Sequence, residues 1–231
     1  MTTHPPPTGA TEVWALADGT RVSVRPVTPQ DEMLLLDFAV NLSRDTRQRW
    51  FRAAIKGASA SLLTRPGQMD WRRHGALIVT AFDRGVERIV ADARFVISGT
   101  ESAEFALVVA DRWQGRGIGK RALVALGVAA QRRGLRWLRG DVPEDDPVML
   151  QLMGQCGFRR RPHPDEDGVA RMEKPLPPLG RPGERDDDDL KPNWLAALWS
   201  RSADAASVNL EQLSVDLITL LNSPPKRSMP V

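Results

Sequence analysis

A glycine-rich segment in the middle of the chain constrains the fold more than any other feature. Gln114 to Gly119 reads QGRGIG; it follows the apolar run 103–109 and precedes a stretch, about 117–133, with apolar residues at helical spacing. A strand, a glycine turn and a helix start form an anion-binding device, because the first N–H groups of a helix lack intrahelical acceptors. Glycines also let the backbone approach the anion closely. The segment therefore predicts a bound phosphate.

The spacing of the glycines separates three kinds of phosphate site. A dinucleotide fingerprint needs a third glycine where Lys120 stands, and a P-loop needs a glycine where Gln114 stands. Both patterns fail at those positions. The pattern Gln/Arg-x-x-Gly-x-Gly does fit, filled by Gln114, Gly117 and Gly119.

The charge of the chain is concentrated around the same segment. The formal net charge is only +3, but residues 112–140 contain no acid and eight basic residues: Arg112, Arg116, Lys120, Arg121, Arg132, Arg133, Arg136 and Arg139. Such a field attracts the phosphates of a nucleotide cofactor or of a nucleic acid. Because the phosphate motif already accounts for the basic residues, we expect no nucleic-acid partner.

Composition limits the class of protein and its compartment. The 231 residues are 42% hydrophobic and 26% charged, which is typical of a globular protein. The longest apolar run, 122–130, is too short to span a bilayer, and the N-terminus shows no secretory signal. Cys156 is the single cysteine, and the three histidines show no metal-ligand spacing. We expect a cytoplasmic protein without a membrane contact or a bound metal.

Hydrophobic periodicity and turn residues predict an α+β fold. Strand patterns at 13–16 and 21–25 flank Asp18-Gly19, which favours a type I′ hairpin turn. Helical patterns begin near residue 30 and at 44, and the apolar strand 103–109 is expected in the middle of the sheet. The other predicted elements are strands 76–82, 88–97 and 136–142, helix 148–156, and a hairpin formed by 158–161 and 169–174. This order predicts a mixed sheet with helices packed on it.

The chain divides into four segments by composition. Residues 1–10 are proline-rich and predicted to be disordered, and 11–175 form the folded domain. Prolines and an acidic run make 176–190 a linker, and 191–231 are predicted to form a helical tail. The tail is too small to bury its own apolar face. It would therefore dock on the core, on a partner or on another copy of the chain; the sequence leaves these open.

The glycine pattern, its flanking strand and helix, and the later Gly157-Phe158 together resemble the acetyl-CoA pyrophosphate site of the GNAT superfamily of N-acetyltransferases. Residues 18–31 and 42–51 resemble the start of GNAT domains in bacterial protein lysine acetyltransferases of the Pat type. The resemblance covers about 12–174. It implies a GNAT fold, with a mostly antiparallel sheet flanked by helices and strands splayed around a cleft for coenzyme A. In the family such domains are often joined to larger regulatory modules, and we expect none of these within the 231 residues of this chain.

The resemblance assigns cofactor-binding roles. Backbone amides of the glycine segment would bind the pyrophosphate, Lys120 and Arg121 would add charge, and Val108 and Val109 would offer backbone groups to the pantetheine arm. Asp146 stands where the family usually has an asparagine that bonds the cofactor, although it could instead cap a helix. The predicted cofactor residues are Val108, Val109, Gln114, Gly115, Arg116, Gly117, Ile118, Gly119, Lys120, Arg121 and Asp146.

An acid in an apolar strand is the candidate general base. Glu104 interrupts the run 103–107, and a half-buried carboxylate is suited to take a proton near neutral pH. It occupies the place of the glutamate base that the Pat-type resemblance implies. Alternatively, Glu104 lies on a solvent-exposed face of the strand and has no catalytic role. Asp92 is a weaker candidate for the base.

The tyrosine that protonates the thiolate in many GNAT enzymes is replaced by Met153, and the chain contains no tyrosine. Cys156 is expected in the core.

Three functions remain open at this stage. The first is acetyl transfer to a protein lysine. The second is transfer to a small-molecule amine, which the arginine excess of residues 44–73 disfavours for polycations. The third is a non-catalytic acyl-CoA sensor, consistent with the missing tyrosine and with Asp146.

Overall fold

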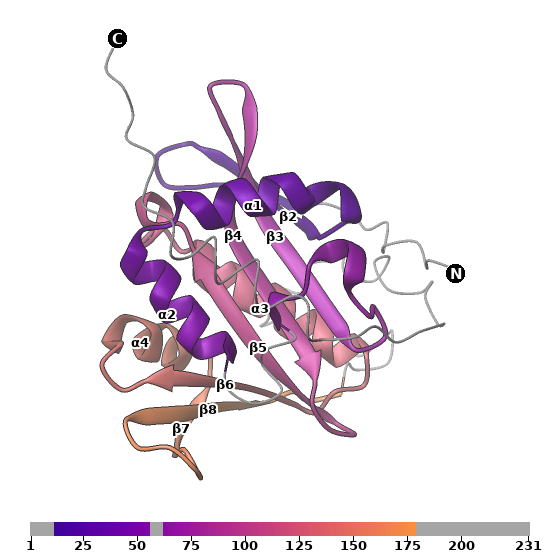
Figure 1. The fold of residues 1–231 in the computed structure, drawn as a ribbon, viewed down its shortest axis with the longest axis vertical. Helices are drawn as coiled ribbons and strands as arrows, with labels where there is room; N and C mark the ends of the chain where they lie inside the picture. The colour runs from indigo at the N-terminus through magenta and orange to yellow at the C-terminus, as the bar shows by residue number, and fades with distance from the viewer. Residues whose placement is uncertain (1–11, 56–61, 179–231) are drawn as a thin grey trace.

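Within residues 12–55 and 62–178, which the computed structural model describes, eight strands form one sheet (Figure 1). Their order is β1-β2-β3-β4-β5-β6-β8-β7, with β5 and β6 parallel and every other neighbouring pair antiparallel. The predicted mixed, mostly antiparallel sheet is confirmed. The strands are β1 (Glu12–Ala15), β2 (Arg21–Pro26), β3 (His74–Asp83), β4 (Val86–Ile97), β5 (Ser102–Val109), β6 (Trp137–Pro143), β7 (Arg159–Pro162) and β8 (Val169–Pro175).

Four α-helices flank this sheet in the described part of the chain: α1 (Glu32–Asn41), α2 (Arg44–Ile55), α3 (Ile118–Arg132) and α4 (Pro147–Gln155). Each corresponds to a helix predicted from periodicity. No helix among the described residues is long and apolar enough to cross a membrane. The predicted N-terminal segment 1–10, the linker from residue 179 and the tail 191–231 lie outside the described residues.

The first hairpin forms as predicted, but its turn differs. Trp14 pairs with Val22, and the Leu16 N–H donates to the carbonyl of Thr20 at 2.8 Å. Only Gly19 has a positive φ in this turn, at 82°, whereas a type I′ turn needs two such residues. The predicted type I′ turn is therefore wrong. The Asp18 carboxylate accepts the Thr20 N–H at 2.9 Å, which stabilises a longer loop with a single left-handed residue.

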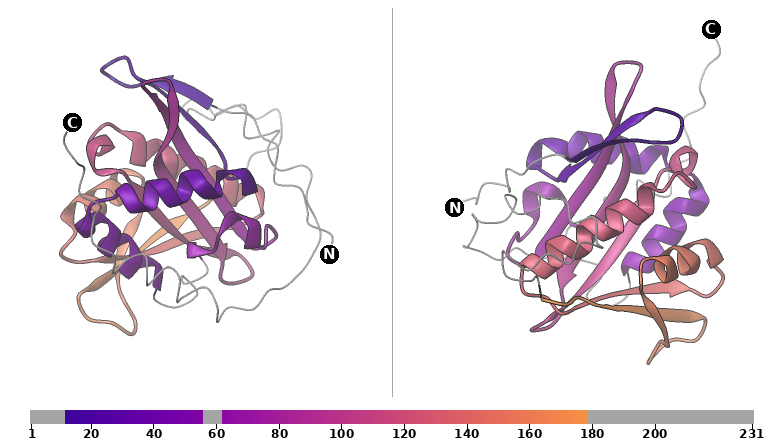
Figure 2. Two further views of the ribbon diagram at one scale, coloured as in Figure 1. Left: turned by 45° about the horizontal axis from the view of Figure 1, so that its top comes forward. Right: turned by 180° about the vertical axis from the view of Figure 1, so that it is seen from behind.

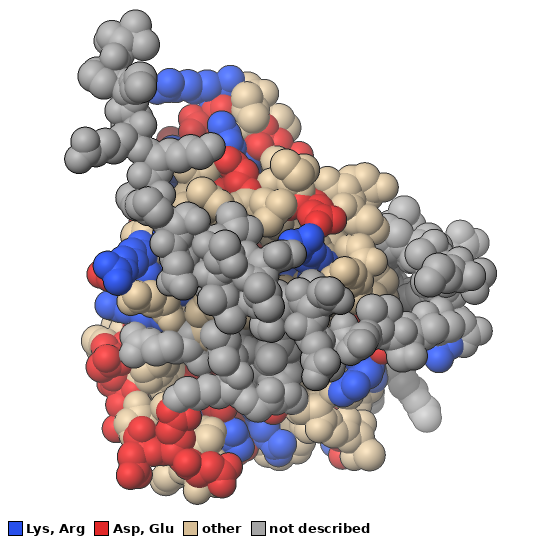
Figure 3. All heavy atoms as spheres, viewed as in Figure 1, with Lys and Arg blue, Asp and Glu red and all other residues tan. Residues whose placement is uncertain are grey.

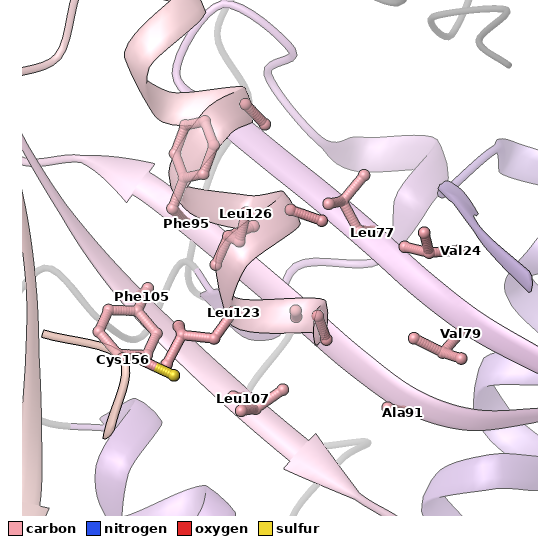
Figure 4. Close-up of a cluster of buried hydrophobic side chains, with 14 of the residues drawn as sticks. Val24, Leu77, Val79, Ala91, Phe95, Phe105, Leu107, Leu123, Leu126 and Cys156 are labelled. Carbon is pink, nitrogen blue, oxygen red and sulfur yellow. The ribbon is translucent and has the colours of Figure 1, made fainter. Parts of the chain in front are cut away.

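The helices cover opposite faces of the sheet. Figure 2 shows α3 lying across one face, while α1 and α2 cover the other (Figure 1). Alternation along β4 explains the two cores, because Ala93 and Phe95 face α3 whereas Val96 joins the cluster beneath α1 and α2. On the α3 side, Leu123 and Leu126 pack over Phe95 and Phe105 (Figure 4).

Strands β5 and β6 pair over three residues and then separate. Ser102 to Glu104 are in register with Trp137 to Arg139, and the pairing ends there. Beyond that point the Phe105 ring packs on Gly140 and lies 5.2 Å from the ring of Phe158. These rings sit where further pairing would bring the two strands together. The expected splaying of strands is thus confirmed.

We predict that Gly75→Ala destabilises the fold. A Cβ at Gly75 would lie 2.3 Å from Cε1 of Phe95, a ring that is fully buried, so the packing around it must shift. We expect the free energy of unfolding to fall by about 1–3 kcal/mol in urea titrations. Gly154→Ala is the matched control, because no atom lies within 4 Å of its added Cβ and alanine favours helix. Equal stability of the two variants would contradict the packing argument.

Candidate active site

A cleft of about 590 Å³ opens where β5 and β6 separate. Helix α2, helix α4 and the glycine segment complete its walls. Eight of the predicted site residues line it: Val108, Val109, Gln114, Gly115, Gly117, Gly119, Lys120 and Asp146. The tertiary structure therefore brings the end of β5, the glycine segment and the start of α4 together around one space.

The glycine segment has the conformation that an anion site requires. Gly115 has φ 72°, and Gly117 precedes α3 with φ 79°, so both lie in the left-handed region that favours glycine. The first hydrogen bond of the helical ladder runs from the Arg121 N–H to the carbonyl of Gly117, at 3.2 Å. The N–H groups at the helix start precede this ladder. They can therefore be offered to a ligand.

One side-chain hydrogen bond and one close approach at a glycine fix the segment against its neighbours. The Gln114 Nε2 donates to the carbonyl of Val109 at 3.0 Å, which ties the turn to the end of β5. A Cβ at Gly119 would lie 3.1 Å from Leu152 of α4 and 3.5 Å from Val109. The absence of a side chain at Gly119 thus lets α3 approach both β5 and α4 closely.

Three predicted cofactor residues direct their side chains elsewhere. Arg116 forms an ion pair with Asp18 at 2.7 Å, and Arg121 lies over the Trp14 ring at 5.0 Å. Ile118 is buried in the core beneath α3. Their backbone groups stay candidates for the pyrophosphate, but among the basic side chains of the motif Lys120 is the one that lines the cleft.

Asp146 lies on the cleft wall and caps α4. Its Oδ1 accepts the N–H of Met149 at 3.0 Å, which is a standard helix cap. Asp146 therefore caps a helix, which is the alternative role that the sequence allowed. Arg49 of α2 reaches within 3.8 Å of Oδ2, so a cation partly offsets the negative charge that Asp146 places in the cleft.

Asp111 links α2 to the glycine segment, a role that we did not foresee from the sequence. Its carboxylate accepts the N–H and hydroxyl of Ser43 at 2.9 and 2.7 Å and the hydroxyl of Thr46 at 2.7 Å. Burial acts to raise the pKa of Asp111, but these hydrogen bonds outweigh it and the pKa is lowered. The Ser-x-x-Thr spacing at the start of a predicted helix was the available signal.

Glu104 lies half-buried on β5, in register with Val96 on one side and Arg139 on the other. It shares the sheet face of Ala106 and Val108, which pack beneath α1 and α2. Among the described residues, the lining of the cleft begins at the next position, Phe105, and does not include Glu104 itself. Its predicted role as base stays a prediction.

The alternative base, Asp92, is held in a buried ion pair. Its side chain is 1% exposed, and the Arg94 Nη2 lies 2.7 Å from Oδ2, with Nε donating at 2.9 Å. Arg94 also donates to the carbonyls of Leu62 and Thr64, at 3.2 and 2.8 Å. Asp92 thus organises the segment that follows α2.

The position of the missing tyrosine is apolar. Met153 is buried and lines the cleft, so its side chain offers no proton donor there.

Cys156 is buried in the core as predicted, and burial raises the pKa of its thiol. Within the described residues no group of three or more histidine, cysteine, aspartate or glutamate side chains is arranged to hold a metal ion.

The sheet with splayed strands and the glycine turn at the head of α3 are features of the GNAT fold. The chain is 33% identical over 160 residues to acetyltransferase Pat of Mycolicibacterium smegmatis, covering 68% of this chain and 46% of that protein. It is 29% identical over 155 residues to acetyltransferase PA5475 of Pseudomonas aeruginosa, covering 67% and 83%. No family model matches the chain.

A solved structure shows the same likeness. The GNAT domain of S. lividans PAT superposes with a TM-score of 0.60 and 26% identity, covering 72% of this chain and 97% of that domain. The chain spans about half the length of the Pat relative, and the similarity to the S. lividans structure covers its GNAT domain. The described part of the chain therefore has the GNAT fold, and its sequence is similar to that of Pat acetyltransferases.

We predict that Gly117→Ala weakens acetyl-CoA binding. The substitution places an L side chain at φ 79°, which costs about 1–2 kcal/mol and shifts the N–H groups ahead of α3. Calorimetric titration with CoA should show about a tenfold loss of affinity. Gly134→Ala is the control, since it has φ 76° and equally open space at the opposite end of α3. It should lose similar stability and keep its affinity; a comparable loss of affinity would argue against the assigned site.

Proposed function

We propose that this chain transfers the acetyl group of acetyl-CoA to the amine of a protein lysine, with Glu104 as general base. The observation that carries the proposal is the position of Glu104. A half-buried carboxylate stands on the strand that leads into the glycine turn, one residue before the wall of the cleft. The likeness to the GNAT domain of S. lividans PAT supports the assignment of the acceptor class.

Residues 105–109 of β5 would hold the pantetheine arm. Pairing with β6 stops at Glu104, so the backbone groups beyond it face the cleft instead of a neighbouring strand. An arm that contains amides can bond to such an edge as an added strand would. The N–H groups at the start of α3 would bind the pyrophosphate, and Lys120 would add a positive charge beside it.

Transfer requires the acceptor amine to be neutral. Glu104 takes a proton from the lysine ammonium, and the amine nitrogen then attacks the thioester carbonyl. The tetrahedral intermediate collapses with cleavage of the carbon–sulfur bond, and its nitrogen releases the second proton to solvent, which leaves an amide and the coenzyme A thiolate. Met153 cannot protonate that thiolate, so it leaves without a dedicated acid. Coenzyme A thiolate is a tolerable leaving group, and the reaction balances in this form.

A small-molecule amine is the second candidate acceptor. The arginine excess in the sequence of 44–73 disfavoured a polycationic acceptor, but the charged residues that line the cleft disfavour it less. Of the arginines at 44–73, Arg49 lines the cleft, whereas Arg65 pairs with Glu32 at 3.6 Å and Arg73 donates to a carbonyl. Two carboxylates, Asp141 and Asp146, line the same cleft. Figure 3 also shows acidic side chains gathered at the end formed by β7, β8 and α4; exposed acids there are Glu144, Asp145, Asp165 and Asp167.

Labelled acetyl-CoA distinguishes the acceptor classes. The purified full chain is incubated with a dialysed bacterial lysate and, separately, with its small-molecule fraction. We expect label in the protein fraction, on lysine side chains, as seen by mass spectrometry. Label confined to the small-molecule fraction would replace the protein acceptor with a small amine. Binding of CoA without label in either fraction would indicate an acyl-CoA-binding regulator instead.

We predict that Glu104→Gln slows transfer by about 10²- to 10⁴-fold, because the amide cannot accept the proton. Affinity for CoA should be unchanged, since the cofactor groups lie beyond Glu104 on β5 and in the glycine segment. Glu101→Gln is the matched control, because Glu101 is exposed just before β5. Initial rates with the lysate proteins measure both variants. Full activity of Glu104→Gln would rule out Glu104 as the base.

A further inference from the structure

A row of charged side chains crosses the sheet from the proposed base to the edge strand β7. Glu104 of β5 is in register with Arg139 of β6, which is in register with Glu173 of β8. Glu173 is in turn in register with Arg159 of β7. Residues in register on neighbouring strands point to the same face, and the face of Glu104 is the one that carries α1 and α2. The row that begins at Glu104 therefore ends in an arginine at the edge of the sheet.

A second row lies two residues further along β6 on the same face. Asp141 of β6 is in register with Arg171 of β8, and Arg171 is in register with Arg161 of β7. The Arg171 Nε and Nη2 donate to the two carboxylate oxygens of Asp141, at 2.9 and 3.1 Å. Arg161 lies two residues from Arg159, so both arginines of β7 point to this face. Together the two rows place four arginines and three carboxylates on it.

The two outer arginines are the ones that these carboxylates leave available. Arg139 Nε lies 3.1 Å from Glu173 Oε1. Arg161 Nε approaches the other oxygen of Glu173 at 4.0 Å, and the Arg161 side chain is 62% exposed. Arg159 is exposed and forms no ion pair with another residue in the described ranges 12–55 and 62–178. The β7 edge of this face is therefore positive and suited to an acidic partner.

Among the described residues, no helix covers this edge. Figure 1 looks onto the face that carries α1 and α2, and β8 and β7 lie below α2 with no helix over them. All four residues of β7 are exposed, whereas Glu104 and Glu173 are half-buried. A polypeptide that crosses the strands can therefore reach Glu104 with one side chain and the β7 arginines with another.

The spacing of the strands sets how far apart those two side chains are along the polypeptide. Strands β5 and β7 are separated by β6 and β8, which makes three strand spacings or about 14 Å. An extended chain rises about 3.3 Å per residue, so this span corresponds to about four residues. An acid at that distance from the acceptor lysine would lie over Arg159 or Arg161 when the lysine reaches Glu104.

We propose that Arg159 and Arg161 form an acceptor edge, which selects protein lysines with an aspartate or glutamate about four residues away in an extended segment. The inference rests on the proposed function, in which Glu104 receives the proton of a protein lysine. The acceptor edge contributes to binding of the acceptor and does not touch the reacting atoms.

Exposed acids near the cleft lie at a different place. They follow β6 or stand in the loop between β7 and β8: Glu144, Asp145, Asp165 and Asp167. A basic segment would favour that end of the strands, whereas an acidic segment would favour the acceptor edge. The charge that is preferred beside the lysine therefore reports which surface the acceptor contacts.

Synthetic peptides with a single lysine test this inference on the full chain. Three peptides carry glutamate, glutamine or arginine at the fourth position before and after the lysine, with serine and threonine elsewhere. The measurement is kcat/KM for each peptide at saturating acetyl-CoA. We expect the glutamate peptide to exceed the glutamine peptide by about three- to tenfold, since it forms exposed ion pairs with the acceptor edge, and the arginine peptide to be the poorest.

Reversal of the charge on the acceptor edge should reverse this order. The double variant Arg159→Glu, Arg161→Glu should transfer acetyl to the arginine peptide faster than to the glutamate peptide. Arg160→Glu is the matched control, because Arg160 points to the opposite face and pairs with Glu144. It should keep the wild-type order. Each comparison is a ratio of two peptides on one protein, so a smaller folded fraction of a variant cancels.

The lysate provides a second measurement that does not depend on short peptides. Acids should be enriched around the lysines that the wild-type chain labels in lysate proteins, and this enrichment should vanish with the double variant. The same ratio of peptides for all three proteins, or a wild-type preference for the arginine peptide, would overturn the inference. So would a preference for acids that appears only after the four aspartates at 186–189 are changed to asparagine, because it would assign the acceptor edge to the acidic run of the chain itself.

Two results separate this inference from the proposed function. If Glu104→Gln slows transfer while the order of the peptides is unaffected by the double variant, Glu104 remains the base and the acceptor edge is wrong. If the wild-type chain labels neither peptides nor lysate proteins, the protein acceptor is wrong and the acceptor edge that rests on it is wrong as well.

Discussion

The end of pairing between β5 and β6 is the constraint on which the site depends. Two parallel strands in register over three residues would normally continue, because each unpaired backbone group inside a protein is costly. Here the Phe105 ring packs on Gly140 and meets Phe158, so aromatic packing occupies the place of further strand pairing. The backbone of β5 beyond Glu104 is left facing a cleft. A ligand with its own amides can satisfy those groups, as the pantetheine arm of the proposed co-substrate would.

Tethers then fix the glycine segment relative to this opening. Asp111 holds the start of α2. Arg116 pairs with Asp18 in the loop between β1 and β2 at 2.7 Å, and Arg112 pairs with Asp83 at the end of β3 at 2.9 Å. Exposed ion pairs of this kind contribute little to stability. These ion pairs instead position the glycine segment, since each joins a residue in or near that segment to a separate part of the sheet. The same contacts explain why these arginines are not directed into the cleft.

Carboxylates on one face of the sheet differ in what surrounds them. Asp92 is 1% exposed and held by the Arg94 guanidinium, so a buried charge is compensated and the pair organises the chain after α2. Glu104, one strand away, is half-buried and one residue from the cleft wall. Asp141 lines the cleft and at the same time holds Arg171. The degree of burial and the nearest cation, rather than the residue type, thus distinguish a carboxylate with a structural role from one that is a candidate for catalysis.

The sequence by itself determined the elements and the phosphate turn, because both depend on local properties. Apolar spacing located the α3 helix and the strands, and the left-handed conformations of Gly115 and Gly117 follow from residue identity. Sequence could not determine where side chains of neighbouring positions point. Arg121 was expected at the cofactor and lies over Trp14 instead, and the Ser-x-x-Thr spacing at the start of α2 did not by itself indicate Asp111 as its partner. The grouping of Asp141 with Arg171 depends on the register between β6 and β8, strands about thirty residues apart in sequence, and only the tertiary structure decides which strands become neighbours.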